Sequence, residues 1–341
     1  MRAVRSDGQS IRVVHDAPDP ALGACDALVH PTRVLVSPAD AASKWAGVVG
    51  HQFVGVVKKL NIPSDAPALV AARASLLNKR VVGTPQIVCT NCDMCRAGLP
   101  AHCRARRVMG LSAREGCFAD LFSIPVSNLV EVPATIEDDR AVFAHLAAGA
   151  VQACHMLRAA SKAYITVIGD SPLALITAQA LARQNKSTRL LHARPECARF
   201  CERWAIKSRA IEEPGRRQDQ DVVIDCTGTA AGLRLALQFV RPRGVVLLKS
   251  PFVGAPFPPG QPFADDSGGG WADGVDLTPA IVNEVQLLGC RDASVADGLG
   301  ALADLGLDVL PLITKRLKLD DAPAAFAAAR SREHFAVMMD L

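Results

Sequence analysis

Four cysteines lie within the stretch Cys89-Thr-Asn-Cys92-Asp-Met-Cys95-Arg-Ala-Gly-Leu-Pro-Ala-His-Cys103. Gaps of two, two and seven residues are typical of a loop that folds four thiolates onto one tetrahedral zinc ion. A zinc ion with four protein ligands has no open coordination position, so we expect one zinc per chain with a structural role. The spacing leaves two alternatives open, namely a pair of disulfide bonds or surface cysteines that are close by chance.

Cysteine usage and charge limit the kind of protein that the sequence can encode. The 341-residue chain has eleven cysteines and a net charge of +4, with lysine and arginine spread along its length. This spread predicts no nucleic-acid partner, and the small cluster Arg104, Arg106 and Arg107 is typical of a solvated loop face. No apolar run resembles a secretion signal or a membrane span, so we expect no membrane partner. Metal-binding thiols need a reducing compartment, which predicts a cytoplasmic protein.

Short strands surround the cysteine loop. Valine-rich segments separated by proline and glycine predict a β-rich, barrel-like domain, from which the cysteine loop is an excursion. The expected strands span residues 11–14, 26–30, 32–36, 50–60, 79–83, 118–125 and 128–133.

The pattern changes after residue 137, where buried strands begin to alternate with helices. This alternation predicts a doubly wound parallel sheet, and therefore an α/β protein. The proline- and glycine-rich segment 251–276 has the composition of a mobile loop or of a tolerated surface insertion. An amphipathic helix at 322–330 and a strand at 335–340 end the chain, and we expect that strand to rejoin the first domain. The other expected helices span 138–158, 173–184, 195–204 and 230–240, and the strands 163–169, 188–192, 221–228, 244–249 and 284–290.

A turn after the first of these strands has the position of a dinucleotide-binding turn. Gly169-Asp-Ser171-Pro-Leu-Ala174 follows a strand and opens a helix, as a G-x-G-x-x-G turn does. Gly169 can make the tight turn and Ala174 is accepted where the helix packs on the strand, but the side chain of Ser171 takes space beside a pyrophosphate. The segment therefore indicates either a nucleotide site or a related domain that has lost its nucleotide.

The end of the second strand favours NADP over NAD. In an NAD site an acid usually stands there and binds the ribose 2′-hydroxyl group. This sequence instead has His192-Ala-Arg194, with Arg199 one helical turn further on. Cationic side chains suit the 2′-phosphate of NADP, although charges of this kind are also common at helix ends.

The cysteine loop, a Gly50-His51 turn and the alternating sheet occur together in one family. Gly50-His51-Gln52-Phe-Val-Gly is similar to a GHE-x-x-G segment, and Asp225-Cys-Thr227-Gly228 and Arg241-Pro-Arg-Gly244 are similar to turns of a nucleotide-binding sheet. Pro311-Leu-Ile-Thr314 is similar to a return to the first domain. With these segments the chain resembles the zinc-containing medium-chain alcohol dehydrogenases over nearly its whole length.

The resemblance implies a particular division of the chain and a particular activity. We expect a GroES-like β-rich catalytic domain at 1–140 with its zinc lobe at 89–103, a Rossmann domain at 141–295, and a C-terminal return at 296–341. The implied activity is hydride transfer between NAD(P) and a small-molecule alcohol or carbonyl substrate, in a homodimer or homotetramer. The implied cofactor contacts are Gly169, Ser171, Ala174, His192, Arg194, Arg199, Thr227 and Gly228.

The departures from the family pattern fall where the catalytic zinc is expected. Ser37-Pro-Ala39-Asp40 resembles the family's C-G-T-D segment, so Ser37 replaces a thiolate ligand by a poorer, neutral hydroxyl. Ala39 replaces a hydroxyl residue that relays the substrate proton. His51 keeps a ligand position, whereas Gln52 replaces the acid beside it. His145 falls near the position of the third ligand.

These departures predict that the catalytic zinc is altered or lost while the structural zinc is kept. In a zinc-free site His51 or His145 would donate a proton to a carbonyl group being reduced, although a packed or solvated histidine is the alternative for each. A zinc ion held by His51, His145 and Asp40 is a further hypothesis. The same departures also fit a non-catalytic relative that serves as a binding or assembly scaffold. The candidate catalytic residues are Ser37, Asp40, His51, Gln52 and His145.

Overall fold

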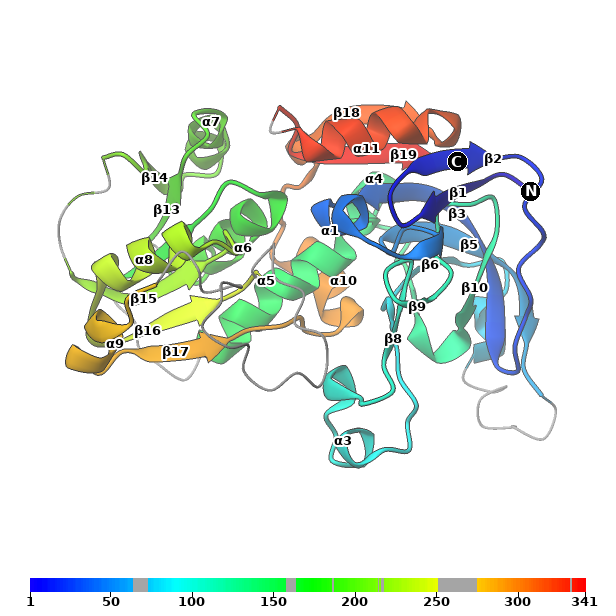
Figure 1. Ribbon diagram of the computed structural model, residues 1–341, viewed down its shortest axis with the longest axis horizontal. Coiled ribbons are helices and arrows are strands. Elements are labelled where there is room, and N and C mark those ends of the chain that lie inside the picture. The colour runs from blue at the N-terminus through cyan, green and yellow to red at the C-terminus, as the bar shows by residue number, and fades with distance from the viewer. Residues whose placement is uncertain are drawn as a thin grey trace. The chain divides into compact units, whose positions relative to one another are not determined.

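The structure is a computed structural model that describes residues 1–63, 73–157, 164–185, 187–213, 215, 218–250, 275–331 and 333–341. The chain divides into two units, one of Met1–His145 with Ser294–Leu341 and the other of Leu146–Ala293 (Figure 1). The segment 251–276, expected to be a loop, lies outside the described residues except for its last two positions. Among the described residues, no helix is both long and apolar enough to cross a membrane.

The first unit is built around the long strand β3 (Asp26–Val36). Its sheet has the order β11-β6-β5-β3-β19-β18, and β10 also pairs with β3. The C-terminal strand β19 runs antiparallel to β3, with Val337 opposite Val36, so the end of the chain completes this sheet. The other strands are β5 (Phe53–Asn61), β6 (Arg80–Gly83), β10 (Phe122–Pro125), β11 (Leu129–Glu131), β18 (Ile313–Lys318) and β19 (Ala336–Asp340).

The prediction of two strands at 26–30 and 32–36 is wrong, because β3 runs through Pro31 without a break. The pairing of β3 with β5 shifts register between Pro31 and Arg33. Proline has no N–H group to donate to a ladder, and an irregularity of this kind is where a sheet tolerates it.

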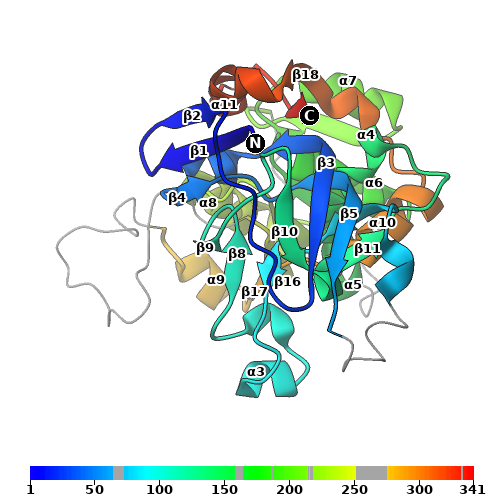
Figure 2. The same cartoon turned by 90° about the vertical axis from the view of Figure 1, so that its right-hand side faces the viewer.

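Two smaller sheets complete the first unit, and the cysteine loop extends from one of them. One consists of β1 (Ala3–Asp7), β2 (Ile11–Val14) and β4 (Ala46–Val48), and the other of β7 (Gln86–Ile87), β8 (Arg107–Met109) and β9 (Ala113–Arg114). The chain leaves the unit after β7 and returns at β8. Figure 2 shows the short helix α3 (Asp93–Arg96) at the far end of this excursion.

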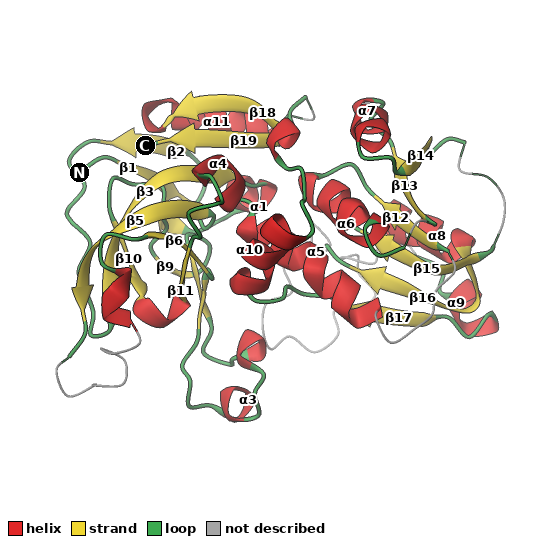
Figure 3. Cartoon of the chain, turned by 180° about the vertical axis from the view of Figure 1, so that it is seen from behind, coloured by secondary structure: helices red, strands yellow, loops and turns green. Residues whose placement is uncertain are grey.

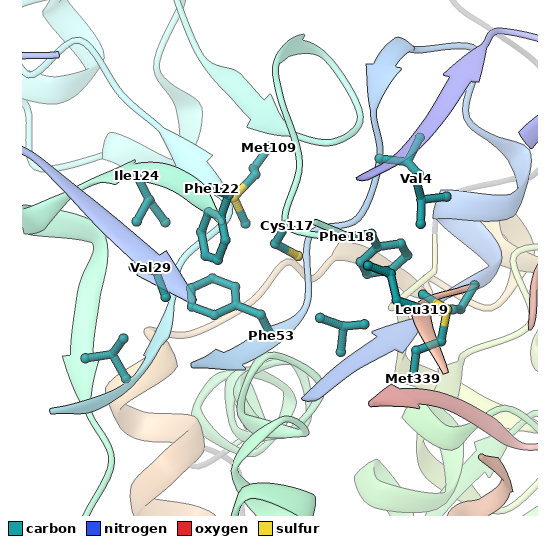
Figure 4. Packing of buried hydrophobic residues seen from close by; sticks show 14 of the residues in the cluster. Val4, Val29, Phe53, Met109, Cys117, Phe118, Phe122, Ile124, Leu319 and Met339 are labelled. Atoms are coloured by element: carbon teal, nitrogen blue, oxygen red, sulfur yellow. The ribbon is translucent and has the colours of Figure 1, made fainter. Parts of the chain in front are cut away.

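The core of the first unit contains several phenylalanine side chains, among them Phe53, Phe118 and Phe122 (Figure 4). The rings of Phe53 and Phe122 meet edge to face at 4.7 Å, and Phe118 is fully buried. Gly50 has a φ of +97°, and a Cβ atom there would clash with the ring of Phe118. The glycine therefore lets the backbone pass over Phe118 directly before His51.

The second unit contains the predicted doubly wound sheet, and the α/β fold class is confirmed. Its strand order is β14-β13-β12-β15-β16-β17, and every neighbouring pair is parallel. Counted along the chain this is the order 3-2-1-4-5-6 of a dinucleotide-binding fold. Figure 3 shows helices lying against the strands of this sheet. The elements are β12 (Ile165–Ile168), β13 (Thr188–His192), β14 (Lys207–Ala210), β15 (Gln220–Asp225), β16 (Val240–Leu248), β17 (Gln286–Gly289), α6 (Pro172–Ala182), α7 (Glu196–Arg203), α8 (Ala230–Phe239) and α9 (Thr278–Val282).

Several element boundaries differ from the expectation. The helix expected over 138–158 is two helices, α4 (Asp138–Ala141) and α5 (Ala144–Leu157), with a turn at Val142 and Phe143. Strand β16 begins at Val240, before the expected residue 244. Sequence reasoning missed β14 and the helix α10 (Val295–Asp304), whereas it placed α11 (Ala322–Arg330) correctly.

Candidate functional site

The four cysteines of the excursion come together in space. Their sulfur atoms all lie within 4.8 Å of one another, with Cys103 Sγ 3.5 Å from Cys89 Sγ and 4.0 Å from Cys92 Sγ. Sulfurs bound to one tetrahedral zinc ion at about 2.3 Å are about 3.8 Å apart, so this cluster fits zinc. The eleven cysteines, all within the described residues, are free thiols, so the pair of disulfide bonds left open by the spacing is not formed.

Backbone geometry favours the thiolate form at two of the four cysteines. Cys92 precedes α3 and Cys95 lies within it, and burial raises the pKa of Cys95 to about 12. Backbone hydrogen bonds at Cys95 and Arg104 lower the pKa of Cys92 to about 6, and a backbone hydrogen bond at Cys89 lowers the pKa of Cys103. Thiolates are the form that binds a metal ion, so the donor chemistry agrees with the geometry.

A second group of polar residues lies in the first unit around α1 (Pro38–Ala42). Ser37 caps this helix: its Oγ accepts from the Asp40 N–H at 3.1 Å and donates to Asp40 Oδ2 at 2.8 Å. The other carboxylate oxygen, Asp40 Oδ1, lies 2.7 Å from His51 Nδ1. Both side chains are buried, at 6% exposure for His51 and 0% for Asp40. The Ser37 hydroxyl and both Asp40 oxygens are therefore engaged with one another and with His51.

His51 also meets Gln52 and His145. Gln52 Nε2 lies 3.3 Å from His51 Nε2, and the His145 ring stands edge-on to the His51 ring at 5.8 Å. Gln52 is buried, and its Oε1 has no hydrogen-bond partner within the described ranges. The structure thus brings all five candidate catalytic residues into one cluster, with His51 at its centre.

The candidate cofactor residues lie at the carboxyl edge of the second unit's sheet. Gly169 follows β12 with a φ of +141°, and a Cβ atom there would lie 3.1 Å from Ala174 Cβ and 3.3 Å from Cys226 Cβ. Only glycine allows strand and helix this close, as a dinucleotide turn requires. Ser171 caps α6, and its Oγ accepts from the Ala174 N–H at 3.2 Å. This serine therefore occupies one of the amide donors that an anion would use.

The strands beside β12 bring further polar groups to the same edge. His192 ends β13 and is buried, its Nδ1 has no partner in the described part of the chain, and burial lowers its pKa. Arg194 is half-buried and Arg199 is exposed on α7. After β15, Thr227 donates to Asp225 Oδ1 from its N–H at 2.8 Å and from its hydroxyl at 2.7 Å, and Gly228 has a φ of +63°. The glycine turns at Gly169 and Gly228, together with the unpartnered Nδ1 of His192, fit a bound dinucleotide.

Two residues of this edge were missed as site residues by sequence reasoning. Asp225 is buried and burial raises the pKa of its carboxyl group, while Lys249 directly follows β16 and is also buried. Both are charged residues that end a run of buried strand residues, and this signal is visible in the sequence.

Comparisons with known proteins agree with this arrangement. The family model of the alcohol dehydrogenase GroES-like domain matches residues 23–134. An L-threonine 3-dehydrogenase from Escherichia fergusonii is 26% identical over 349 residues, which cover 95% of this chain and 94% of that protein. Another from Anaeromyxobacter sp. (strain K) is 25% identical and covers 100% of this chain and 97% of its own length.

Solved structures share the whole fold. A zinc-binding dehydrogenase from Sinorhizobium meliloti 1021, bound to NADP, has a TM-score of 0.79 at 21% identity, and an alcohol dehydrogenase from Thermus sp. ATN1 has 0.79 at 23%. Each comparison covers 100% of this chain and 99% of the other. The chain is thus similar over its whole length to zinc-containing medium-chain alcohol dehydrogenases. These similarities support an NAD(P)-dependent oxidoreductase with a small-molecule substrate.

Proposed function

We propose that the chain is an NADP-preferring alcohol or carbonyl oxidoreductase with one structural zinc ion, in which the His51–Asp40 pair takes over the acid–base role of a lost catalytic zinc. One observation carries this proposal. The residue at the position of the family's thiolate ligand, Ser37, uses its hydroxyl to cap α1 and to hold the carboxylate that binds His51. A helix cap of this kind has no negative charge to offer a metal ion.

The residues of the first unit support proton transfer at His51. When bound, a reduced nicotinamide cofactor supplies the hydride. Asp40 fixes the Nδ1–H form of His51, so Nε2 is the atom that takes up a proton and delivers it to the carbonyl oxygen. The 3.3 Å contact between Gln52 Nε2 and His51 Nε2 would be given up when the ring takes up its proton, because both nitrogens are then donors. Asp40 at the same time stabilises the positive charge of that ring.

The cysteine cluster and the sheet edge support the choice of cofactors. Cys89, Cys92, Cys95 and Cys103 would hold the zinc ion, which keeps the excursion folded. Arg194 follows the strand that ends at His192, where an acid would be needed for NAD, so a 2′-phosphate is favoured. Gly169, Ala174, Thr227 and Gly228 would line the rest of the dinucleotide.

Metal analysis together with nucleotide titration tests this function. We expect one zinc per chain and saturable NADPH binding with a Kd below about 100 µM, tighter than that of NADH. Arg194→Ala should weaken NADPH about tenfold and leave NADH unchanged within roughly twofold, because only NADPH has the 2′-phosphate. Two zinc ions per chain would instead support a metal held beside His51. No binding of either nucleotide at millimolar concentration would favour the non-catalytic scaffold.

We further propose a homodimer formed through α9 and β17. Within the described ranges β17 pairs only with β16, and all four of its residues are exposed. Ile281 and Val282 of α9 are 77% and 72% exposed, beside this edge. An open strand edge next to apolar side chains is a template for pairing with a second copy. Light scattering should give a dimer that Ile281→Glu converts to a monomer, whereas Leu77→Glu, at a similarly apolar exposed site of the first unit, should not. A monomeric wild-type protein would contradict this proposal.

A cytoplasmic location is also proposed. The free thiols of all the cysteines, four of them gathered as metal ligands, suit a reducing compartment. Reaction with a thiol reagent in unlysed and lysed cells would test it, since labelling of a cytoplasmic protein requires lysis or a permeant reagent.

A further inference from the structure

A buried lysine stands at the carboxyl edge of the nucleotide-binding sheet. Lys249 follows the last residue of β16, and its N–H donates to the Asp225 carbonyl at 2.8 Å. Its side chain is 1% exposed and its Nζ lies 3.1 Å from Asp292 Oδ1. Nζ also donates to the backbone carbonyl of Arg291. Lysine is almost never buried to this degree unless it is paired, so the surrounding residues must accommodate the ammonium group.

The surrounding structure makes room for this ion pair. Gly149 on α5 faces it, because a Cβ atom added there would lie 3.4 Å from Lys249 Cε and 3.0 Å from Asp292 Oδ1. The Ala293 N–H donates to the Ala148 carbonyl at 3.1 Å and holds Asp292 against the same helix. Gly149 of α5 and the adjacent residues Arg291 and Asp292 thus converge on the Lys249 side chain.

The position of Lys249 assigns it to one half of the cofactor site. In a sheet of order 3-2-1-4-5-6, the first three strands carry the pyrophosphate turn and the ribose contacts of the adenosine half. Here those features are Gly169, which follows β12, and His192, the last residue of β13. The nicotinamide half therefore falls to the carboxyl ends of β15, β16 and β17, and Lys249 ends the middle strand of these three.

We propose that Lys249 is a specificity-determining residue that makes the nucleotide site prefer the reduced cofactor, NADPH, over NADP⁺, and so favours carbonyl reduction. This inference rests on the proposed function, since it concerns the same nucleotide site. The nicotinamide ring is cationic when oxidised and neutral when reduced, so a fixed ammonium group in its half of the crevice repels only the oxidised form. Asp292 offsets this repulsion in part, because its side chain is 30% exposed and is screened by water, whereas Lys249 is not.

The ratio of the Kd of NADP⁺ to the Kd of NADPH tests the proposal without any assay of turnover. Lys249→Met should lower this ratio about tenfold, because the repulsion is removed and Asp292 is left to attract the oxidised ring. Asp292→Asn should change it in the opposite direction, raising it roughly threefold or more, because the ammonium loses its counter-charge. Lys249→Arg, which keeps the charge, should leave the ratio close to that of the wild type.

An exposed lysine of the same unit provides the matched control. Lys207→Met, on β14, removes the same charge from the surface and should leave the ratio unchanged within roughly twofold. Thermal melting shows which variants fold, and if Lys249→Met does not, the opposite effect expected for Asp292→Asn still tests the proposal. Equal ratios in the wild type and in all folded variants would overturn it and assign the ion pair a structural role. Failure of the wild type to bind either nucleotide would instead overturn the proposed function itself.

Discussion

Cys103→Ser is expected to release the zinc ion and to lower the melting temperature by roughly 10 °C. Cys103 is the buried member of the cluster, and its sulfur contacts those of both Cys89 and Cys92. The excursion contains only short helical segments and turns, so a metal ion bound by the cluster would replace the apolar core that it lacks. Losing a structural metal costs about 3–5 kcal/mol, and each kcal/mol lowers the melting temperature of a domain of this size by about 2–4 °C. Elemental analysis and differential scanning calorimetry measure the two effects.

A cysteine outside the cluster supplies the control for this substitution. Cys25 is a half-buried free thiol of the same unit, so Cys25→Ser removes the same sulfur without touching a ligand. It should retain one zinc per chain and melt within roughly 2 °C of the wild type. A strong chelator should reproduce the effect of Cys103→Ser on the wild-type protein and should add nothing to the variant. Full zinc content in Cys103→Ser would show that the cluster is not the metal site.

The sequence predicted the sheet of the second unit well because its signal is local. The strand at residues 165–168 is fully buried and rich in β-branched residues, and the helix α6 of eleven residues follows it. The missed strand β14 reads Lys-Ser-Arg-Ala and has no apolar pattern, because it lies at the edge of the sheet. The break between α4 and α5 escaped prediction because neither glycine nor proline marks the turn at Val142 and Phe143.

The first unit was harder to predict because its strands pair over long distances. The continuity of β3 through Pro31 depends on β5 and β19, which supply its partners from far along the chain. Proline in a strand pattern normally predicts an end, and only the register shift with β5 makes it tolerable here.

In the candidate site, too, the sequence shows which residues are present but not which of them are in contact. The sequence shows a serine, Ser37, where the resemblance implies a cysteine, but it does not show what that serine contacts. Ser37 and Asp40 have the spacing of a capping box, yet the link from Asp40 to His51 joins two segments eleven residues apart and needs the turn at Gly50. The pairing of Lys249 with Asp292 similarly arises because parallel strands end at one edge of the sheet.

His51→Gln is expected to lower the rate of carbonyl reduction about 10²- to 10⁴-fold while leaving the Kd of NADPH unchanged. Glutamine can keep a hydrogen bond to Asp40, but it cannot hold a proton for delivery to a carbonyl oxygen. Asp40→Asn should lower the rate by a smaller factor, of roughly tenfold or more. An asparagine holds the Nδ1–H tautomer of His51 less firmly and does not stabilise the positive charge of the protonated ring. The measurement is NADPH oxidation with a panel of small aldehydes and ketones, combined with fluorescence titration of NADPH.

A second histidine of the first unit separates a catalytic His51 from a structural one. His30→Gln is the matched control, because the Nδ1 of His30 lies 2.8 Å from the Asp120 carbonyl and not against Asp40. This variant should keep the wild-type rate, because its histidine is not placed to deliver a proton. A His51→Gln variant that binds NADPH, melts like the wild type and reduces the same substrates at the wild-type rate would exclude His51 as the acid and would direct attention to His145.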